Sequence, residues 1–72
     1  MSLNHCFARN LRRYRQEKKF TQEELAKLSG VSETLINVAE RERSNISLGN
    51  IEKIAKALDI DAYKLLYPQK TV

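Results

Sequence analysis

The chain has 72 residues, of which 42% are hydrophobic and 31% charged, and its formal net charge is +4. This length and composition indicate one small, soluble globular domain, and no apolar run approaches the roughly 20 residues that cross a bilayer. The polar start with scattered apolar residues does not resemble a signal peptide. Nine acidic residues are interspersed with thirteen basic ones, so the charge permits nucleic-acid binding without requiring it.

Cysteine and histidine usage limits the possible chemistry. Cys6 is the single cysteine, which excludes an intramolecular disulfide and fits a reducing, cytoplasmic compartment. It follows the single histidine, His5, and these two ligands are too few for a zinc site. No catalytic Ser–His–acid set or glycine-rich phosphate loop is recognisable. We therefore expect no metal, no cofactor, no small-molecule ligand and no enzymatic activity.

Helical periodicity runs through the chain and predicts an all-α fold of five helices. The first covers about residues 3–18, and its apolar side chains share one face at spacings i, i+4, i+8 and i+11. These side chains are Leu3, Phe7, Leu11 and Tyr14. The arginines between them are expected to point mostly to water: Arg9, Arg12 and Arg13.

Four further helix starts share one arrangement, in which apolar residues five positions apart flank a Ser, Thr or Asp cap. The pairs are Phe20 with Leu25 around Thr21, Val31 with Ile36 around Ser32, Ile46 with Ile51 around Ser47, and Ile60 with Leu65 around Asp61. Thr21 and Glu24 also match a capping box. The predicted helices are about 22–29, 32–42, 47–58 and 61–66, the last ended by Pro68.

The connection between the second and third predicted helices is short. Gly30 can adopt a positive φ there, and the small Ala26 allows the next helix to cross closely, with Ile36 between the two. Two helices held at about 90–120° by such a turn form a helix-turn-helix unit, whose second helix can enter a DNA major groove. Residues 21–42 are therefore predicted to be a helix-turn-helix.

The stretch "TQEELAKLSGVS…I…AER", followed by "NISLGNIEKIAKALDI" and a short last helix, resembles the Xre-type, lambda-repressor-like DNA-binding domain. The similarity covers residues 7 to 66 and, within the family, is greatest to the small controller proteins of restriction–modification systems. It implies a five-helix domain over residues 1–72, double-stranded DNA as partner, and an autoregulatory homodimer on a palindromic operator. Family members usually carry Gly where this chain has Lys19 and Glu42, so those two turns are expected to differ in length or shape.

The resemblance places the DNA-binding residues at the starts of the two helices, on the outer face of the second, and in the loop after it. They are Gln22, Ser32, Glu33, Thr34, Asn37, Val38, Arg41, Arg43, Ser44 and Asn45. Thr34 and Asn37 can hydrogen-bond base edges, Val38 can touch a thymine methyl group, and the loop residues suit the phosphate backbone.

Each of these assignments has a structural alternative. Gln22 could be an exposed residue without a contact, and Ser32 could serve only as a helix cap. Glu33 could act only on the helix dipole, and Val38 could pack in the core beside the small Ala39. The loop 41–45 could be merely solvated.

Two further expectations concern packing. Arg15 and Glu40 match a family ion pair that would anchor the DNA-reading helix without touching DNA. A domain of this size buries only about 60% of its unfolded surface. Residues 47–67 hold more apolar surface than it can cover, so they are expected to form a two-fold dimer interface. That interface would contain Ile51, Tyr63, Leu66 and Tyr67, with Leu65 in the core.

A function of another class also fits the sequence. The helix-turn-helix could be repurposed for protein–protein interaction, as in an antitoxin-like or anti-repressor component. An exposed apolar residue on the helix at 32–42 would favour this alternative, whereas a positive potential around Gln22, Lys27 and Arg43 would favour DNA.

Overall fold

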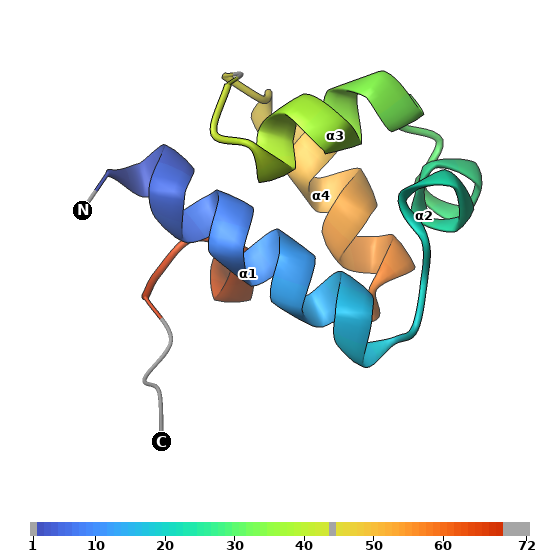
Figure 1. Cartoon of the computed structure of the whole chain (residues 1–72). Helices are drawn as coiled ribbons and strands as arrows, with labels where there is room; N and C mark the ends of the chain where they lie inside the picture. The colour runs from blue at the N-terminus through green and yellow to red at the C-terminus, as the bar shows by residue number, and fades with distance from the viewer. Residues whose placement is uncertain (1, 44, 69–72) are drawn as a thin grey trace.

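The computed structural model describes residues 2–43 and 45–68, and within these ranges the chain is helical without strands (Figure 1). The elements in order are α1 (Leu3–Glu17), α2 (Gln22–Ser29), α3 (Glu33–Glu40), α4 (Leu48–Ala57) and the 3₁₀ helix η1 (Ala62–Leu65). The all-helical prediction is confirmed, but the prediction of five α-helices is wrong, because the described residues contain four.

The last predicted helix, at 61–66, is a single 3₁₀ turn. Asp61 makes no side-chain capping bond, and the turn is closed by i→i+3 hydrogen bonds from Lys64 N to Asp61 O and from Leu66 N to Tyr63 O, both 3.0 Å. Few residues separate it from Pro68, which has no N–H to extend a helical ladder. A short tight turn therefore replaces the expected α-helix.

The other predicted caps are confirmed. The hydroxyl oxygens of Ser32 and Ser47 each accept a hydrogen bond from the backbone N–H three residues later, at 3.1 Å. Thr21 and Glu24 form the full capping box, with bonds of 2.9 and 3.0 Å. Ser2 caps α1 in the same way, since its Oγ accepts from His5 N at 3.1 Å. Each start thus satisfies backbone donors that the helix itself leaves free.

Three helices end on a left-handed residue that is not glycine: Lys19 at φ 61°, Glu42 at φ 61° and Asp59 at φ 58°. After each of them the next amide donates back to the carbonyl five residues earlier, as from Phe20 to Arg15 at 3.1 Å and from Ile60 to Ala55 at 3.0 Å. This is the Schellman arrangement usually built on glycine. The expectation of altered turns at Lys19 and Glu42 is therefore wrong, because both turns close with this bond, from Phe20 N to Arg15 O and from Arg43 N to Val38 O. The bond helps to offset a left-handed cost of about 1–2 kcal/mol, and after Lys19 the packing of Phe20 against the core contributes as well.

The α3 helix ends at Glu40, two residues earlier than predicted, because of this turn. Arg43 N donates to Val38 O at 2.9 Å and Glu42 N donates to Ala39 O at 3.1 Å, so the chain leaves the helical path. Gly30 ends α2 in the expected left-handed conformation, at φ 78°. Space around it is open, so its backbone conformation rather than a close approach calls for glycine.

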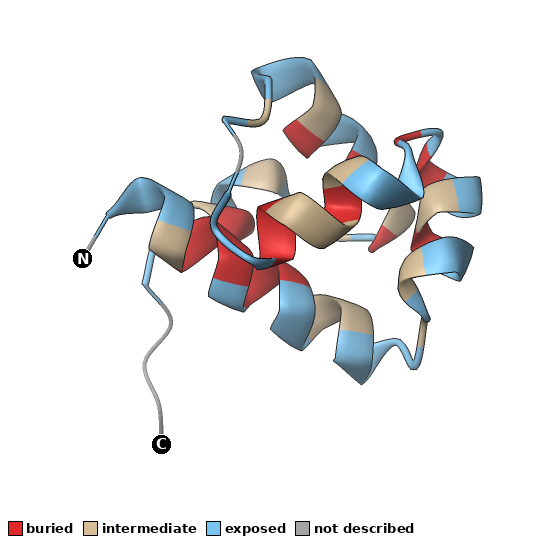
Figure 2. Cartoon of the chain, turned by 45° about the horizontal axis from the view of Figure 1, so that its top comes forward, coloured by how far each residue is buried: buried red, intermediate tan, exposed pale blue. Residues whose placement is uncertain are grey.

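The core lies on the inward faces of all five elements (Figure 2). Its largest fully buried side chains are Leu11, Leu25, Ile36, Ile54, Leu58 and Leu65. Phe20 and Ile60 pack partly against this core and occupy the junctions before α2 and η1. Leu3 departs from the predicted apolar face, since 62% of it is exposed at the first turn of α1.

A buried asparagine, which the sequence pattern did not single out, fastens the C-terminal segment to α1. Asn10 is 3% exposed, and its Nδ2 donates to Leu65 O at 3.0 Å and to Tyr67 O at 2.8 Å. Leu65 is the last residue of the 3₁₀ turn and Tyr67 follows the turn, so no helical N–H donates to either carbonyl oxygen. The two ends of the domain are therefore joined through one amide.

Candidate nucleic-acid interface

The α3 helix follows α2 after the predicted turn and packs against both α2 and α1 (Figure 1). Val31 is 4% exposed in this turn, and its N–H donates to Ser29 Oγ at 3.1 Å. Ile36, Ala39 and Glu40 form the buried face of α3. The exposed Glu33 and Thr34 begin the outward face.

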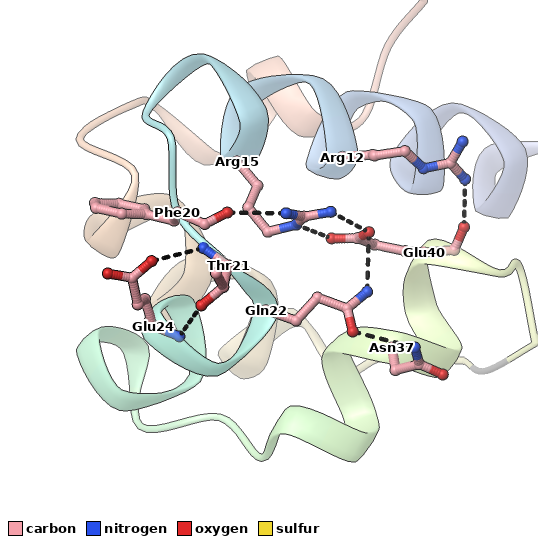
Figure 3. Close-up of polar contacts among 8 residues, drawn as sticks. All are labelled: Arg12, Arg15, Phe20, Thr21, Gln22, Glu24, Asn37 and Glu40. Carbon is pink, nitrogen blue, oxygen red and sulfur yellow. Dashed lines mark hydrogen bonds and ion pairs between the residues drawn. The ribbon is translucent and has the colours of Figure 1, made fainter.

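A partly buried ion pair joins α1 to the end of α3 (Figure 3). Arg15 Nε donates to Glu40 Oε2 at 2.6 Å, and Arg15 Nη2 donates to Glu40 Oε1 at 3.0 Å. Arg15 Nη1 also donates to Phe20 O at 2.8 Å. The hydrogen bond to Glu40 is the main cause that raises the pKa of Arg15, against the opposing effect of burial. A raised pKa on a base keeps it charged to still more alkaline pH, so the pair does not lose its cation near neutrality.

Gln22, at the first position of α2, extends this pair toward the outer face of α3. Its Nε2 donates to Glu40 Oε1 at 3.1 Å, and its Oε1 accepts from Asn37 Nδ2 at 3.1 Å. Figure 3 shows the Gln22 side chain between the other two. The alternative that Gln22 is an exposed residue without a contact is therefore wrong.

Arg12 supplies a second link from α1 that sequence reasoning missed. Although Arg12 is exposed, as expected, its Nη2 donates to Glu40 O at 2.8 Å. A cation at the last carbonyls of a helix also interacts favourably with the helix dipole. Two arginines thus bind the C-terminus of α3. They lie three residues apart and therefore on the same side of α1, and this spacing could have indicated the second contact.

The remaining expected DNA-binding residues lie on one side of α3 and in the loop after it. Asn37 and Val38 are half-buried, so Val38 is neither a core residue nor fully outward. Arg41, Arg43 and Asn45 are exposed. Asn45 Oδ1 accepts from Asn4 Nδ2 at 3.3 Å, which ties this loop to α1, while Ser44 lies outside the described residues.

The expected dimer residues fall into two groups. Tyr63 and Tyr67 are 56% and 45% exposed, and their rings stack with centroids 5.7 Å apart. Leu66 is half-buried, whereas Ile51 is only 6% exposed and belongs to the core. What remains accessible of Ile51 faces a groove of about 240 Å³. The groove is lined by Leu3, Asn4, Phe7, Asn45, Ile46, Leu48, Ile51 and Leu66.

Across residues 2–43 and 45–68, no three side chains of His, Cys, Asp or Glu come together as a metal site would require. None of the described helices is long and apolar enough to span a membrane.

Comparison with protein families gives a match to the family described as Helix-turn-helix over residues 11–65. The chain belongs to this helix-turn-helix family. The Xre-type resemblance inferred from the sequence is confirmed. The matched range of the helix-turn-helix domain includes Arg15, Glu40 and all the expected DNA-facing residues, but it ends before Leu66 and Tyr67.

Known proteins similar to this helix-turn-helix chain include transcription factors and controller proteins. A hypothetical transcription factor of Neisseria meningitidis is 47% identical over 92% of the chain, which spans 62% of that relative. Control protein C.SmaI of Serratia marcescens is 38% identical, with 96% of the chain and 82% of the relative covered. The crystal structure of the restriction–modification controller protein C.AhdI from Aeromonas hydrophila superposes with a TM-score of 0.84 at 41% identity, covering 88% of this chain and 96% of that one.

Proposed function

We propose that this protein is a sequence-specific DNA-binding transcription regulator in which α3 reads the major groove. The observation that carries the proposal is the outward side of α3, whose exposed residues Glu33 and Thr34 are polar. The helix is held in place by the ion pair at its end. The large exposed hydrophobic side chains of the described residues lie on other elements: Leu3, Leu28, Leu48, Tyr63 and Tyr67. An α3 surface without such a residue favours DNA over the alternative of a protein partner.

The proposed contacts divide between bases and phosphates. Thr34 and Asn37 would meet base edges when the N-terminal half of α3 enters the groove. Ser32 caps α3 and leaves its exposed N-terminus suited to a phosphate. Arg41 and Arg43, exposed after α3, supply positive charge to the backbone. Glu33 is compatible with this arrangement only as a first-turn dipole residue or as an acceptor from cytosine N4.

A homodimer on a palindromic operator is part of the proposal. The support is the exposed tyrosine pair at residues 63 and 67, together with the half-buried Leu66 beside the apolar groove. A two-fold dimer would present two copies of α3 about 34 Å apart, matching half-sites one DNA turn apart. Sedimentation at tens of micromolar should give a dimer, and Tyr67→Ser should weaken it. A wild-type monomer with and without DNA would refute this part.

Autoregulation is proposed from the similarity to the controller proteins C.SmaI and C.AhdI. Regulation would then depend on protein concentration and dimerisation.

Selection of bound sequences from a random DNA pool tests the function directly. We expect enrichment of a palindrome, and binding to it should weaken roughly a thousandfold or more between 50 and 200 mM salt if the dimer contacts about 6–8 phosphates. Absence of any enriched sequence at low salt would contradict sequence-specific binding. Enriched DNA placed before the coding sequence should then alter expression of the protein itself.

A further inference from the structure

We propose that Gln22 is a positioning residue for base recognition: it fixes the direction of the Asn37 amide so that Asn37 accepts adenine and rejects guanine. This inference rests on the proposed function, because it assigns a specificity to the same face of α3. It assigns Gln22 a role within the protein instead of the direct DNA contact expected from the sequence.

The ion pair sets the direction of the hydrogen bonds that run from Glu40 through Gln22 to Asn37. A guanidinium only donates and an ionised carboxylate only accepts, so the pair of Arg15 and Glu40 leaves Glu40 Oε1 as an acceptor for a further donor. Gln22 must therefore turn its NH₂ group toward Glu40, at 3.1 Å. The opposite orientation would place two acceptor oxygens at hydrogen-bond distance.

The same reasoning fixes Asn37. The Gln22 carbonyl, forced away from Glu40, faces Asn37 and can only accept, so Asn37 must direct its Nδ2 toward Gln22, at 3.1 Å. One N–H of Asn37 is used in this bond. Its Oδ1 and its second N–H remain, as one acceptor and one donor. Because Glu40 is 4% exposed, the first hydrogen bond of this network is shielded from water.

This remaining pair of groups distinguishes the purines. Adenine presents an N6–H donor and an N7 acceptor in the major groove, which complements an amide offering one acceptor and one donor. Guanine presents two acceptors, O6 and N7, so the fixed Oδ1 would face an oxygen or nitrogen lone pair. An asparagine free to rotate could turn its oxygen away and donate to guanine instead. Gln22 removes that freedom, and discrimination is the consequence.

The test compares Gln22→Leu with the wild type on operators obtained by selection. Leucine cannot hydrogen-bond, while both bonds between Arg15 and Glu40 remain possible. For the wild type, replacing adenine by guanine at one position in one half-site should weaken binding about tenfold to a hundredfold. Gln22→Leu should reduce this ratio to about threefold or less at that position and leave the ratios at other positions unchanged.

Three further variants make the test specific. Asn37→Ala should remove the preference at the same position, and Gln22→Leu should change nothing more in that background. Gln22→Met removes the same hydrogen bonds with a different shape and gives the measurement if the leucine variant folds poorly. Gln16→Leu, at an exposed glutamine of α1, makes the same chemical change outside the interface and should keep wild-type discrimination.

The outcomes separate this inference from the proposed function. If Gln22→Leu and Gln22→Met weaken binding equally to all sequences, Gln22 contacts the backbone and the positioning role is wrong while the function stands. Unchanged ratios at every position would also overturn the positioning role alone. A wild type that selects no sequence would overturn both.

Discussion

Removal of Arg15 tests whether the ion pair anchors α3. In Arg15→Met the Glu40 carboxylate, whose side chain is 5% exposed, loses both guanidinium bonds and keeps one donor, from Gln22. Breaking a buried pair by removing one partner costs about 3–5 kcal/mol. At roughly 0.05–0.15 kcal/mol per residue, a domain of this length has a total stability of about 4–11 kcal/mol. The substitution should therefore remove a large part of it.

The opposite substitution should cost less. In Glu40→Gln the arginine side chain remains 14% exposed and keeps its bond to Phe20 O, and the new amide can still accept. We expect a loss of about 1–3 kcal/mol. The double variant Arg15→Met, Glu40→Met should recover most of the stability, since well-packed apolar side chains often replace a buried pair without loss.

Urea denaturation, followed by far-ultraviolet circular dichroism, measures the free energy of unfolding of the wild type and of the three variants. Each kcal/mol should lower the thermal midpoint by about 4–8 °C in a domain of this size, so Arg15→Met should melt at least about 12 °C below wild type. A loss under 1 kcal/mol for Arg15→Met would show that the carboxylate is effectively solvated. A double variant as unstable as Arg15→Met would show that the loss is not caused by an unpaired charge.

Three other substitutions test the turns and the loop. Gly30→Ala should destabilise by about 1–2 kcal/mol in urea titrations, because φ is 78° while the space is open; a neutral result would mean that the backbone relaxes. Lys19→Gly should stabilise by up to about 1 kcal/mol, and a loss would show that the lysine side chain contributes more than its strained backbone costs. Arg43→Ala should weaken DNA binding equally for all sequences and reduce the salt slope by about one per subunit, whereas an altered sequence preference would contradict a phosphate contact.

Much of the fold could be predicted from local sequence because its helix starts carry a capping residue flanked by an apolar pair. Thr21, Ser32 and Ser47 each cap a helix where the flanking apolar pair indicated. The same pattern around Asp61 did not give an α-helix, since the apolar pair is satisfied by packing Leu65 whether the turn is α or 3₁₀. The end of α3 was predicted two residues too late, because a glutamate at position 42 does not itself indicate a left-handed residue that ends a helix.

One contact of the site could be predicted, through the resemblance of the sequence to the Xre-type domain. That resemblance implied the pairing of Arg15 with Glu40, and the structure contains this pair. Gln22 and Asn37 are amides that both donate and accept, so their bond depends on the crossing of α2 and α3 and not on sequence spacing. Asn10 has the same ambiguity, and its carbonyl partners lie more than 50 residues away.

The bonds of Asn10 have a consequence for the order in which the chain folds. Leu65 O is 55 residues away along the sequence, so this contact closes nearly the whole chain, and it is formed at a high cost in loop entropy. We expect it to form after the rate-limiting step, when the intervening helices are already packed. Asn10→Ala should then accelerate unfolding about tenfold and leave the refolding rate within about twofold of wild type. Stopped-flow chevron analysis distinguishes this from an early role, in which refolding would slow instead. The C-terminal segment would thus determine how long the folded domain persists and have little effect on how fast it is reached.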